Sequence, residues 1–308
     1  MKRLQDTVSV SRVSLPVVVA YSVAVWLLCG LFQQQLWPQL ACFAMCAYLM
    51  VELNNANALI RIYSRMVSCT FLVLSCTACF MFASLKGAVA ELCFVAAYLT
   101  SFRAYQDKQA VGWMYYTFLL VGVSSLLFVH IVYFLPVLWL LVAFKVQALS
   151  WRTFFASLLG LLTPYWFAAV WFVYTSDIDT PMTHFQQLTA YETPFDFEQL
   201  TDHQLAVYVF TLVLALMGTI HYIRTRYNDK IRTRLLFDCF IITDLLALLL
   251  LALQPQHYDM LMRLAIVSTS PLVGHFIALT HTRWTNMVFC IMLVVALAIT
   301  ASCLLMPQ

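Results

Sequence analysis

Eleven long apolar stretches, separated by short polar segments, dominate this 308-residue sequence. Hydrophobic residues make up 63% of the chain and charged residues only 10%, whereas soluble domains carry about 25% charged residues. A soluble core cannot bury that much apolar surface, so the stretches are predicted to face lipid. Because a spanning helix needs about 20 apolar residues, we predict an all-α transmembrane bundle of about eleven spans, within a range of about ten to twelve, forming one domain over 1–308. The predicted spans are 14–32, 36–53, 66–84, 88–102, 111–125, 127–146, 153–174, 204–222, 236–252, 259–280 and 285–305.

The basic residues set the predicted orientation, because lysine and arginine resist translocation and stay in the cytoplasm. If the N-terminus is cytoplasmic, eleven spans place every basic residue except Lys86 and Arg263 on the inner side. The opposite orientation would reverse this bias. The N-terminal segment has no small-residue cleavage site, so it is predicted to be a retained first span.

Two connections are longer than a turn. The outer loop at 175–203 contains six carboxylates and no lysine or arginine, and its prolines and aromatic residues predict a structured cap with a short interfacial helix. Thr201 and Gln204 are predicted to form a capping box that opens the next span. The inner loop at 223–234 holds five basic residues. Three acidic residues of the outer loop are candidate site residues, namely Asp177, Asp179 and Glu192.

Four ionisable residues fall inside the late predicted spans, where a charged side chain is costly and marks a candidate functional residue. The ninth and tenth spans are joined by a short outer turn, so residues equally far from that turn share a depth. This geometry predicts contacts of Asp238 with His275 and of Asp244 with Arg263. Such pairs either orient the two helices or line a polar pathway for a proton, an ion or a lipid phosphate.

A second set of candidates lies at the predicted inner side. Glu52, Asn54 and Asn55 precede Arg61 and Arg65 at the end of the second span. These groups either hold a sugar or phosphate headgroup or cap a helix beside the lipid surface. The inner loop adds four arginines that either anchor the topology against anionic lipids or bind a phosphate-bearing ligand or partner protein. They are Arg224, Arg226, Arg232 and Arg234.

Sequence motifs for soluble cofactors are missing. The chain has no Walker loop, no dinucleotide-binding glycine pattern and no G-x-S-x-G elbow. His184 and His203 in the outer loop lack a metal-ligand spacing. We therefore expect no cofactor and no metal. The expected partners are the lipid bilayer, a polyprenyl-phosphate lipid or another membrane protein, and not nucleic acid.

The segment from Ser150 to Tyr165 reads SWRTFFASLLGLLTPY. It resembles an uncharacterised family of polytopic inner-membrane proteins of Bacteroidetes-type bacteria, in which a Trp-Arg pair also precedes a Leu-Leu-Gly-Leu-Leu-Thr-Pro-Tyr span and an Asn-rich segment lies earlier. The resemblance covers residues 50–175. It implies a multi-pass protein of the bacterial inner (cytoplasmic) membrane, and the family carries no assigned activity.

A weaker resemblance lies in the order of the middle spans, where LLVGVSSL leads into a proline-containing span and a basic inner turn. This order is similar to that of C-type membrane glycosyltransferases, which take sugars from polyprenyl-phosphate donors. Their fold implies a catalytic carboxylate in the first outer loop. That loop reads QQQLWP here, without a carboxylate, so an acidic residue of the 175–203 loop would have to take the role.

Three functions remain open from the sequence. The first is an accessory or scaffold component of cell-envelope assembly, the second a glycosyltransferase-like enzyme that uses a polyprenyl-linked sugar, and the third a transporter of a small molecule or lipid. An outer cavity floored by the 175–203 loop and open sideways to lipid would support the enzyme. A polar cavity at mid-membrane would support the transporter.

Overall fold

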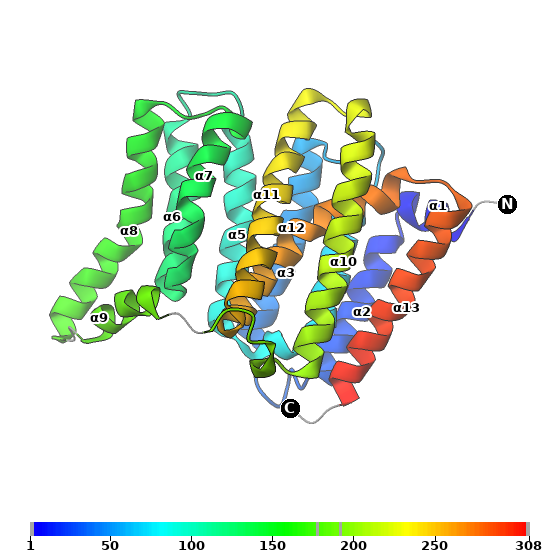
Figure 1. Ribbon diagram of the computed structural model, residues 1–308, viewed down its shortest axis with the longest axis horizontal. Coiled ribbons are helices and arrows are strands. Elements are labelled where there is room, and N and C mark those ends of the chain that lie inside the picture. The colour runs from blue at the N-terminus through cyan, green and yellow to red at the C-terminus, as the bar shows by residue number, and fades with distance from the viewer. Residues whose placement is uncertain (1–2, 177–178, 191–192, 306–308) are drawn as a thin grey trace.

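The computed structural model describes residues 3–176, 179–190 and 193–305. Within these ranges every regular element is a helix, so the predicted all-α fold is confirmed (Figure 1). The α-helices are α1 (Leu4–Val10), α2 (Ser14–Leu28), α3 (Trp37–Asn57), α4 (Met66–Thr77), α5 (Leu85–Arg103), α6 (Val111–Leu127), α7 (Leu135–Leu141), α8 (Trp151–Thr175), α9 (Asp179–Gln186), α10 (Asp202–Thr225), α11 (Ile231–Leu253), α12 (Tyr258–Leu279) and α13 (Arg283–Leu305). Short turns of other helix types are η1 (Cys79–Ala83), η2 (Val129–Phe134), η3 (Val142–Val146), η4 (Gln187–Thr189), η5 (Phe197–Gln199), η6 (Arg226–Asn228) and η7 (Pro255–His257).

Seven helical segments in the described ranges are long and apolar enough to cross a membrane. The helices α1 and α2 give an eighth only if they are counted as one span, because they are bent by 92°. Two more apolar helices, α4 and α6, have only 12 and 17 residues, and α3 ends in a polar Glu52–Asn57 segment. Each of the eleven predicted stretches is thus helical, while the number of crossings remains a prediction.

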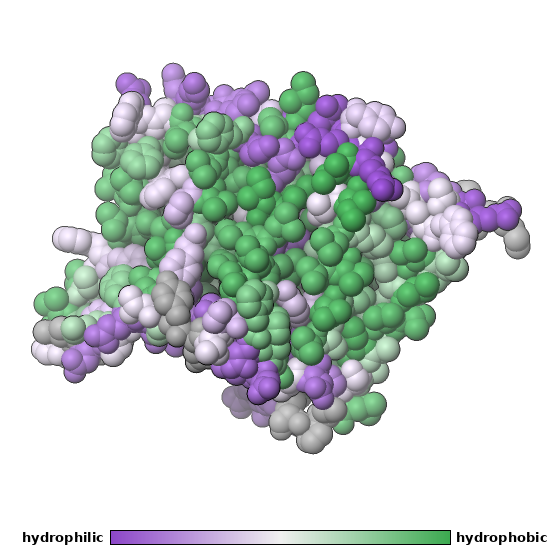
Figure 2. Space-filling view, in the orientation of Figure 1, coloured by the Kyte–Doolittle hydropathy of each residue, from purple (hydrophilic) through white to green (hydrophobic). Residues whose placement is uncertain are grey.

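Apolar side chains form a broad band across the middle of the molecule, and polar side chains gather at its two ends (Figure 2). This distribution is that of a protein embedded in a bilayer. We call the end with the 104–110 and 226–230 turns the basic end. The opposite end, which carries α9, is the α9 end (Figure 1). The predicted capping box opens α10 there, since Thr201 and Gln204 exchange side-chain and backbone hydrogen bonds of 2.9 and 3.4 Å.

The helix α12 lies at the centre of the bundle. Its apolar stretch is entirely buried, and it packs against α4, α5, α10 and α11. Small residues permit this close packing: Gly274 lies against the backbone of Val67, and Gly218 of α10 lies against Leu272. The polar residues of α12 must therefore find partners inside the protein.

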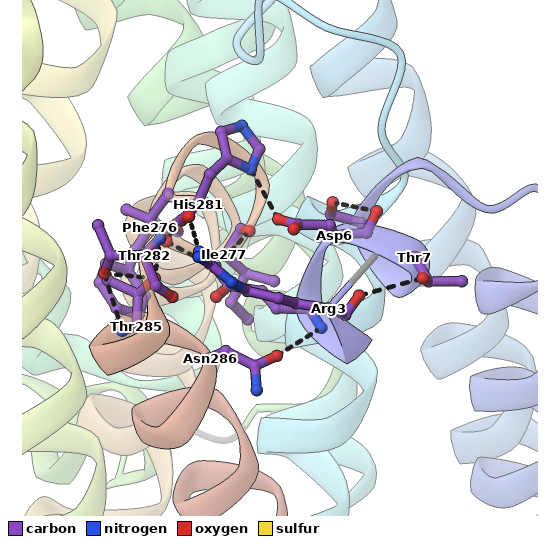
Figure 3. A network of polar contacts seen from close by, with 12 residues as sticks. Arg3, Asp6, Thr7, Phe276, Ile277, His281, Thr282, Thr285 and Asn286 are labelled. Carbon is purple, nitrogen blue, oxygen red and sulfur yellow. Dashed lines mark hydrogen bonds and ion pairs between the residues drawn. The ribbon is translucent and has the colours of Figure 1, made fainter. Parts of the chain in front are cut away.

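The first helix lies across the turn between α12 and α13 and is tied to it by polar contacts (Figure 3). The buried Gln5 amide donates to the carbonyl of Ile277 at 2.9 Å and to the Thr280 hydroxyl at 2.6 Å. Asp6 lies 2.7 Å from His281. These contacts fix the N-terminal segment to the side of the bundle, which accounts for its sharp turn into α2.

The helix α8 lies at the opposite edge and packs mainly on α6 (Figure 1). Gly160 of α8 makes this contact close, because a Cβ atom there would come within 2.3 Å of the Tyr115 carbonyl oxygen. Pro164 lies inside α8, and toward the α9 end α8 leans away from α6 (Figure 1). The two helices therefore touch near the basic end and diverge toward the α9 end, where α9 crosses beneath them.

Candidate functional site

The helices α11 and α12 pack side by side, but the first predicted pair of intramembrane residues does not form. Asp238 forms an ion pair with Lys145 at 2.7 Å and lies 3.7 Å from Arg226. His275 contacts Asp229, with 3.1 Å between Nε2 and Oδ2. The predicted contact of Asp238 with His275 is therefore wrong. Equal distance from a turn fixes the depth of two residues, but it does not fix the helix face on which each lies.

The second predicted pair is also wrong. Arg263 contacts Glu91 of α5 at 2.7 Å and Asp259 at 3.1 Å. Asp244 instead accepts a 2.9 Å hydrogen bond from Thr269, which lies about 9 Å farther along α12 than Arg263 at ~1.5 Å per residue. The guanidinium group therefore reaches the neighbouring α5 more easily than it reaches Asp244.

Polar residues at the middle of the bundle bond to one another. Tyr98 of α5 contacts Ser268 of α12 at 2.9 Å and also contacts Thr243 of α11. Together with the Arg263 and Asp244 contacts, these bonds link α5, α11 and α12. Interhelical hydrogen bonds of this kind hold helices together in membranes. These contacts agree with the prediction that such residues orient helices, which stays a prediction, because Asp244 Oδ2 and His275 Nδ1 are buried without a hydrogen-bond partner among the described residues.

The two predicted headgroup sets come together at the basic end. Arg232 donates a 2.9 Å hydrogen bond to Asn57, and Arg61 donates a 3.4 Å bond to the carbonyl of Asn228. The end of α3 therefore lies beside the basic loop. Asn54 is buried and holds the turn that follows its own helix.

The remaining members of these sets divide into two kinds. Arg234 donates to two backbone carbonyls of its own loop at 2.8 Å each, and Arg65 donates to a tyrosine hydroxyl at 3.4 Å. Glu52, Asn55 and Arg224 have no polar partner within the described ranges. Among the six predicted arginines, Arg61 and Arg234 thus stabilise the basic loop through its backbone carbonyls.

The outer-loop carboxylates are only partly covered by the structure. Asp177 and Glu192 lie outside the described residues. Asp179 begins α9 and is exposed. The predicted short helix in this loop is confirmed by α9, which lies at the end of the molecule away from the basic loops (Figure 1).

A cavity of about 860 Å³ lies between α6, η2, α7, α8 and α9. Its wall is mainly apolar and includes Leu126 and Leu127 of α6 together with Leu161, Leu162 and Phe172 of α8. The cavity lies toward the α9 end, where α8 leans away from α6 (Figure 1). Its volume is within the range of about 300–1,000 Å³ that is usual for small-molecule sites.

Hydrogen bonds attach the segment after α9 to the rest of the bundle. His130 of η2 bonds to the carbonyl of Gln187 at 2.9 Å, and the hydroxyl of Tyr133 donates to the carbonyl of Leu188. Gln256 donates to the carbonyl of Ala190 at 3.3 Å. The outer loop therefore forms a fixed floor for the cavity.

Lys86 of α5 and His184 of α9 line this mainly apolar cavity. Sequence reasoning named neither as a binding residue, because their meeting depends on how α9 crosses below α6. Gly122, Gly160 and Pro164 were the sequence signals of a close contact between two helices that then diverge.

Comparison with known proteins finds no matching family model, no matching curated protein and no matching solved structure.

Proposed function

We propose that this chain is a multi-pass protein of the bacterial inner membrane that holds a lipid in the cavity between α6 and α8, as an accessory component of cell-envelope assembly. The observation that carries the proposal is the cavity itself, about 860 Å³ in volume with a leucine-rich wall and a floor made by α9. Apolar side chains of this kind suit an acyl or isoprenoid chain. A lipid headgroup bound at this floor would lie beside the outer loop.

The proposed orientation puts the basic end in the cytoplasm and α9 outside. Its support is the distribution of basic residues, since all but Lys86 and Arg263 fall on the predicted inner side. An exported reporter inserted in α9 is expected to be active outside the cytoplasm, and cytoplasmic activity there would refute the orientation.

A glycosyltransferase-like activity is the second candidate. Two observations favour it. The cavity is floored by α9 of the 175–203 loop, as expected for the enzyme. Asp179 begins α9, and the next two residues, Thr180 and Pro181, line the cavity. A carboxylate therefore lies next to the proposed lipid site. If it acts as a catalytic base, Asp179→Asn will abolish sugar transfer from a polyprenyl-linked donor without changing lipid retention.

A transport function gains no such support. Asp238, Asp244, Arg263 and His275 each contact a nearby partner. The alternative in which these residues line a continuous pathway would need them to share one cavity. The cavity between α6 and α8 is lined by none of the four.

Retention of lipid through purification tests the proposed function. The protein is purified in mild detergent, and the bound lipids are identified by mass spectrometry. Ala169→Trp fills the cavity from α8, whereas Val170→Trp adds the same side chain at an exposed position that does not line it. We expect a defined lipid on the wild-type protein, at least a tenfold loss in Ala169→Trp, and no loss in Val170→Trp. Equal retention by both variants would refute the proposal.

A further inference from the structure

One lysine and one histidine line the cavity, and no carboxylate does so among the described residues. Lys86 is the charged member, and His184 carries a ring whose protonated form a nearby anion would favour. Lys86 forms no ion pair with any residue in the described ranges. The other basic residue on the predicted outer side, Arg263, is paired with Glu91 and Asp259. Lys86 is thus an exposed cation beside a mainly apolar cavity, with no counter-ion among the described residues.

His184 lies close enough to Lys86 to be affected by its charge. Burial lowers the pKa of His184, the nearby Lys86 ammonium lowers it further, and a hydrogen bond to the backbone of Ser125 acts in the opposite direction. Its Nε2 atom is buried and has no hydrogen-bond partner in the described part of the chain. An anion placed between the two side chains would satisfy this nitrogen and favour the protonated ring.

Aromatic contacts of the next residue also hold the imidazole ring of His184 in position. Phe185, the next residue of α9, stacks on Tyr165 of α8 with 5.8 Å between ring centroids. Tyr165 in turn donates to the Ser125 hydroxyl at 2.9 Å. The site is therefore built on packed aromatic side chains, which fixes the place where an anion would bind.

We infer that Lys86 and His184 bind the phosphate headgroup of the lipid whose apolar chain occupies the cavity. This inference rests on the proposed function, because it assigns the headgroup class of the same lipid. A lipid is favoured over free phosphate because the two side chains share one cavity with the leucines of α6 and α8. The apolar chain and the headgroup of one lipid would then bind together. The protein would thereby distinguish phosphate-bearing lipids from neutral ones.

The experiment compares two lipids that differ only in the phosphate group. The purified full-length protein is placed in phosphatidylcholine vesicles that contain either phosphatidic acid or the diacylglycerol with the same chains, and bound lipid is quantified. We expect the wild-type protein to prefer phosphatidic acid at least tenfold. Lys86→Gln and His184→Gln are each expected to bring the ratio close to one, while Lys86→Arg keeps most of it.

Controls separate the possible failures. Lys108→Gln removes an exposed cation at the basic end and should leave the ratio unchanged. If both lipids bind equally and Ala169→Trp displaces both, the headgroup inference is wrong while the proposed function stands. If the wild-type protein retains neither lipid, both are wrong. Displacement of phosphatidic acid by inorganic phosphate alone would show a free-phosphate site and contradict the lipid assignment. Unchanged thermal unfolding of Lys86→Gln and His184→Gln would confirm that these variants are folded.

Discussion

Replacing Arg263 with methionine is expected to destabilise the protein by about 3–5 kcal/mol, the usual cost of leaving one partner of a buried ion pair alone. Arg263 and Glu91 have side chains only 5% and 7% exposed. Without the guanidinium group, the Glu91 carboxylate would remain buried with no described cation beside it. The carbonyl of Met81, which also accepts from Arg263, would lose its donor. The measurement is the free energy of unfolding of the purified protein in a mild detergent.

Two further variants test the cause of this loss. Arg283→Met makes the same chemical change at an exposed position at the start of α13, where an effect within about 0.5 kcal/mol is expected. The double variant Glu91→Gln with Arg263→Met removes the unpaired carboxylate and should recover part of the loss. If Arg263→Met and Arg283→Met have equal effects, Arg263 does not carry the stabilising role assigned to it.

Replacing Gly160 with alanine is expected to cost about 1–3 kcal/mol, as overpacking of a well-packed contact does. The added Cβ would lie 2.3 Å from the Tyr115 carbonyl oxygen and 3.0 Å from the Leu119 nitrogen. Both are backbone atoms of α6, so neither can rotate away. The two helices must separate, although alanine by itself favours a helix more than glycine does by about 1 kcal/mol.

A matched control is available on the partner helix. Gly112 of α6 has nothing within 4 Å of its ideal Cβ position, so Gly112→Ala should be neutral or slightly stabilising. Thermal unfolding of the two alanine variants gives the comparison directly. A Gly160→Ala protein as stable as Gly112→Ala would show that α6 and α8 do not approach as closely as described.

The positions of the helices were predictable, because long apolar runs in a low-charge chain have one stable arrangement in lipid. The start of α10 was predictable in detail, since Thr201 and Gln204 form a local motif whose contacts depend on neighbouring residues only. The sharp bend between α1 and α2 was not predictable. It depends on Gln5 reaching Ile277 and Thr280, and hydropathy reports how apolar a segment is but not the direction of its axis.

The sequence alone did not predict which residues the ionisable side chains of the late helices would contact. The short turn between the two spans correctly predicted that α11 lies beside α12, but α12 also packs against α1, α4, α5 and α10. Arg263 instead forms an ion pair with Glu91 of α5, and Asp238 forms one with Lys145 at the end of η3. Choosing among several neighbours requires the rotation of each helix about its axis, which is set by packing over the whole bundle.

The cavity was also not predictable from the sequence alone. Gly122, Gly160 and Pro164 are visible in the chain, but their combined effect depends on α8 having α6 as its main neighbour. The carboxylates of the acidic outer loop were predicted as candidate site residues. Its described part instead contributes a floor and one half-buried histidine, His184.

Site-specific photocross-linking in the native membrane tests most directly whether a lipid binds specifically between α6 and α8. A photoreactive phenylalanine analogue replaces Phe172, which lines the cavity, or Phe167, which is 70% exposed on α8 and does not line it. We expect both positions to contact lipid, so the identity of the captured lipid is what distinguishes a specific site from the bilayer. We expect position 172 to capture one phosphate-bearing lipid class and position 167 to capture lipids in their membrane proportions. The same lipid mixture at both positions would contradict the account.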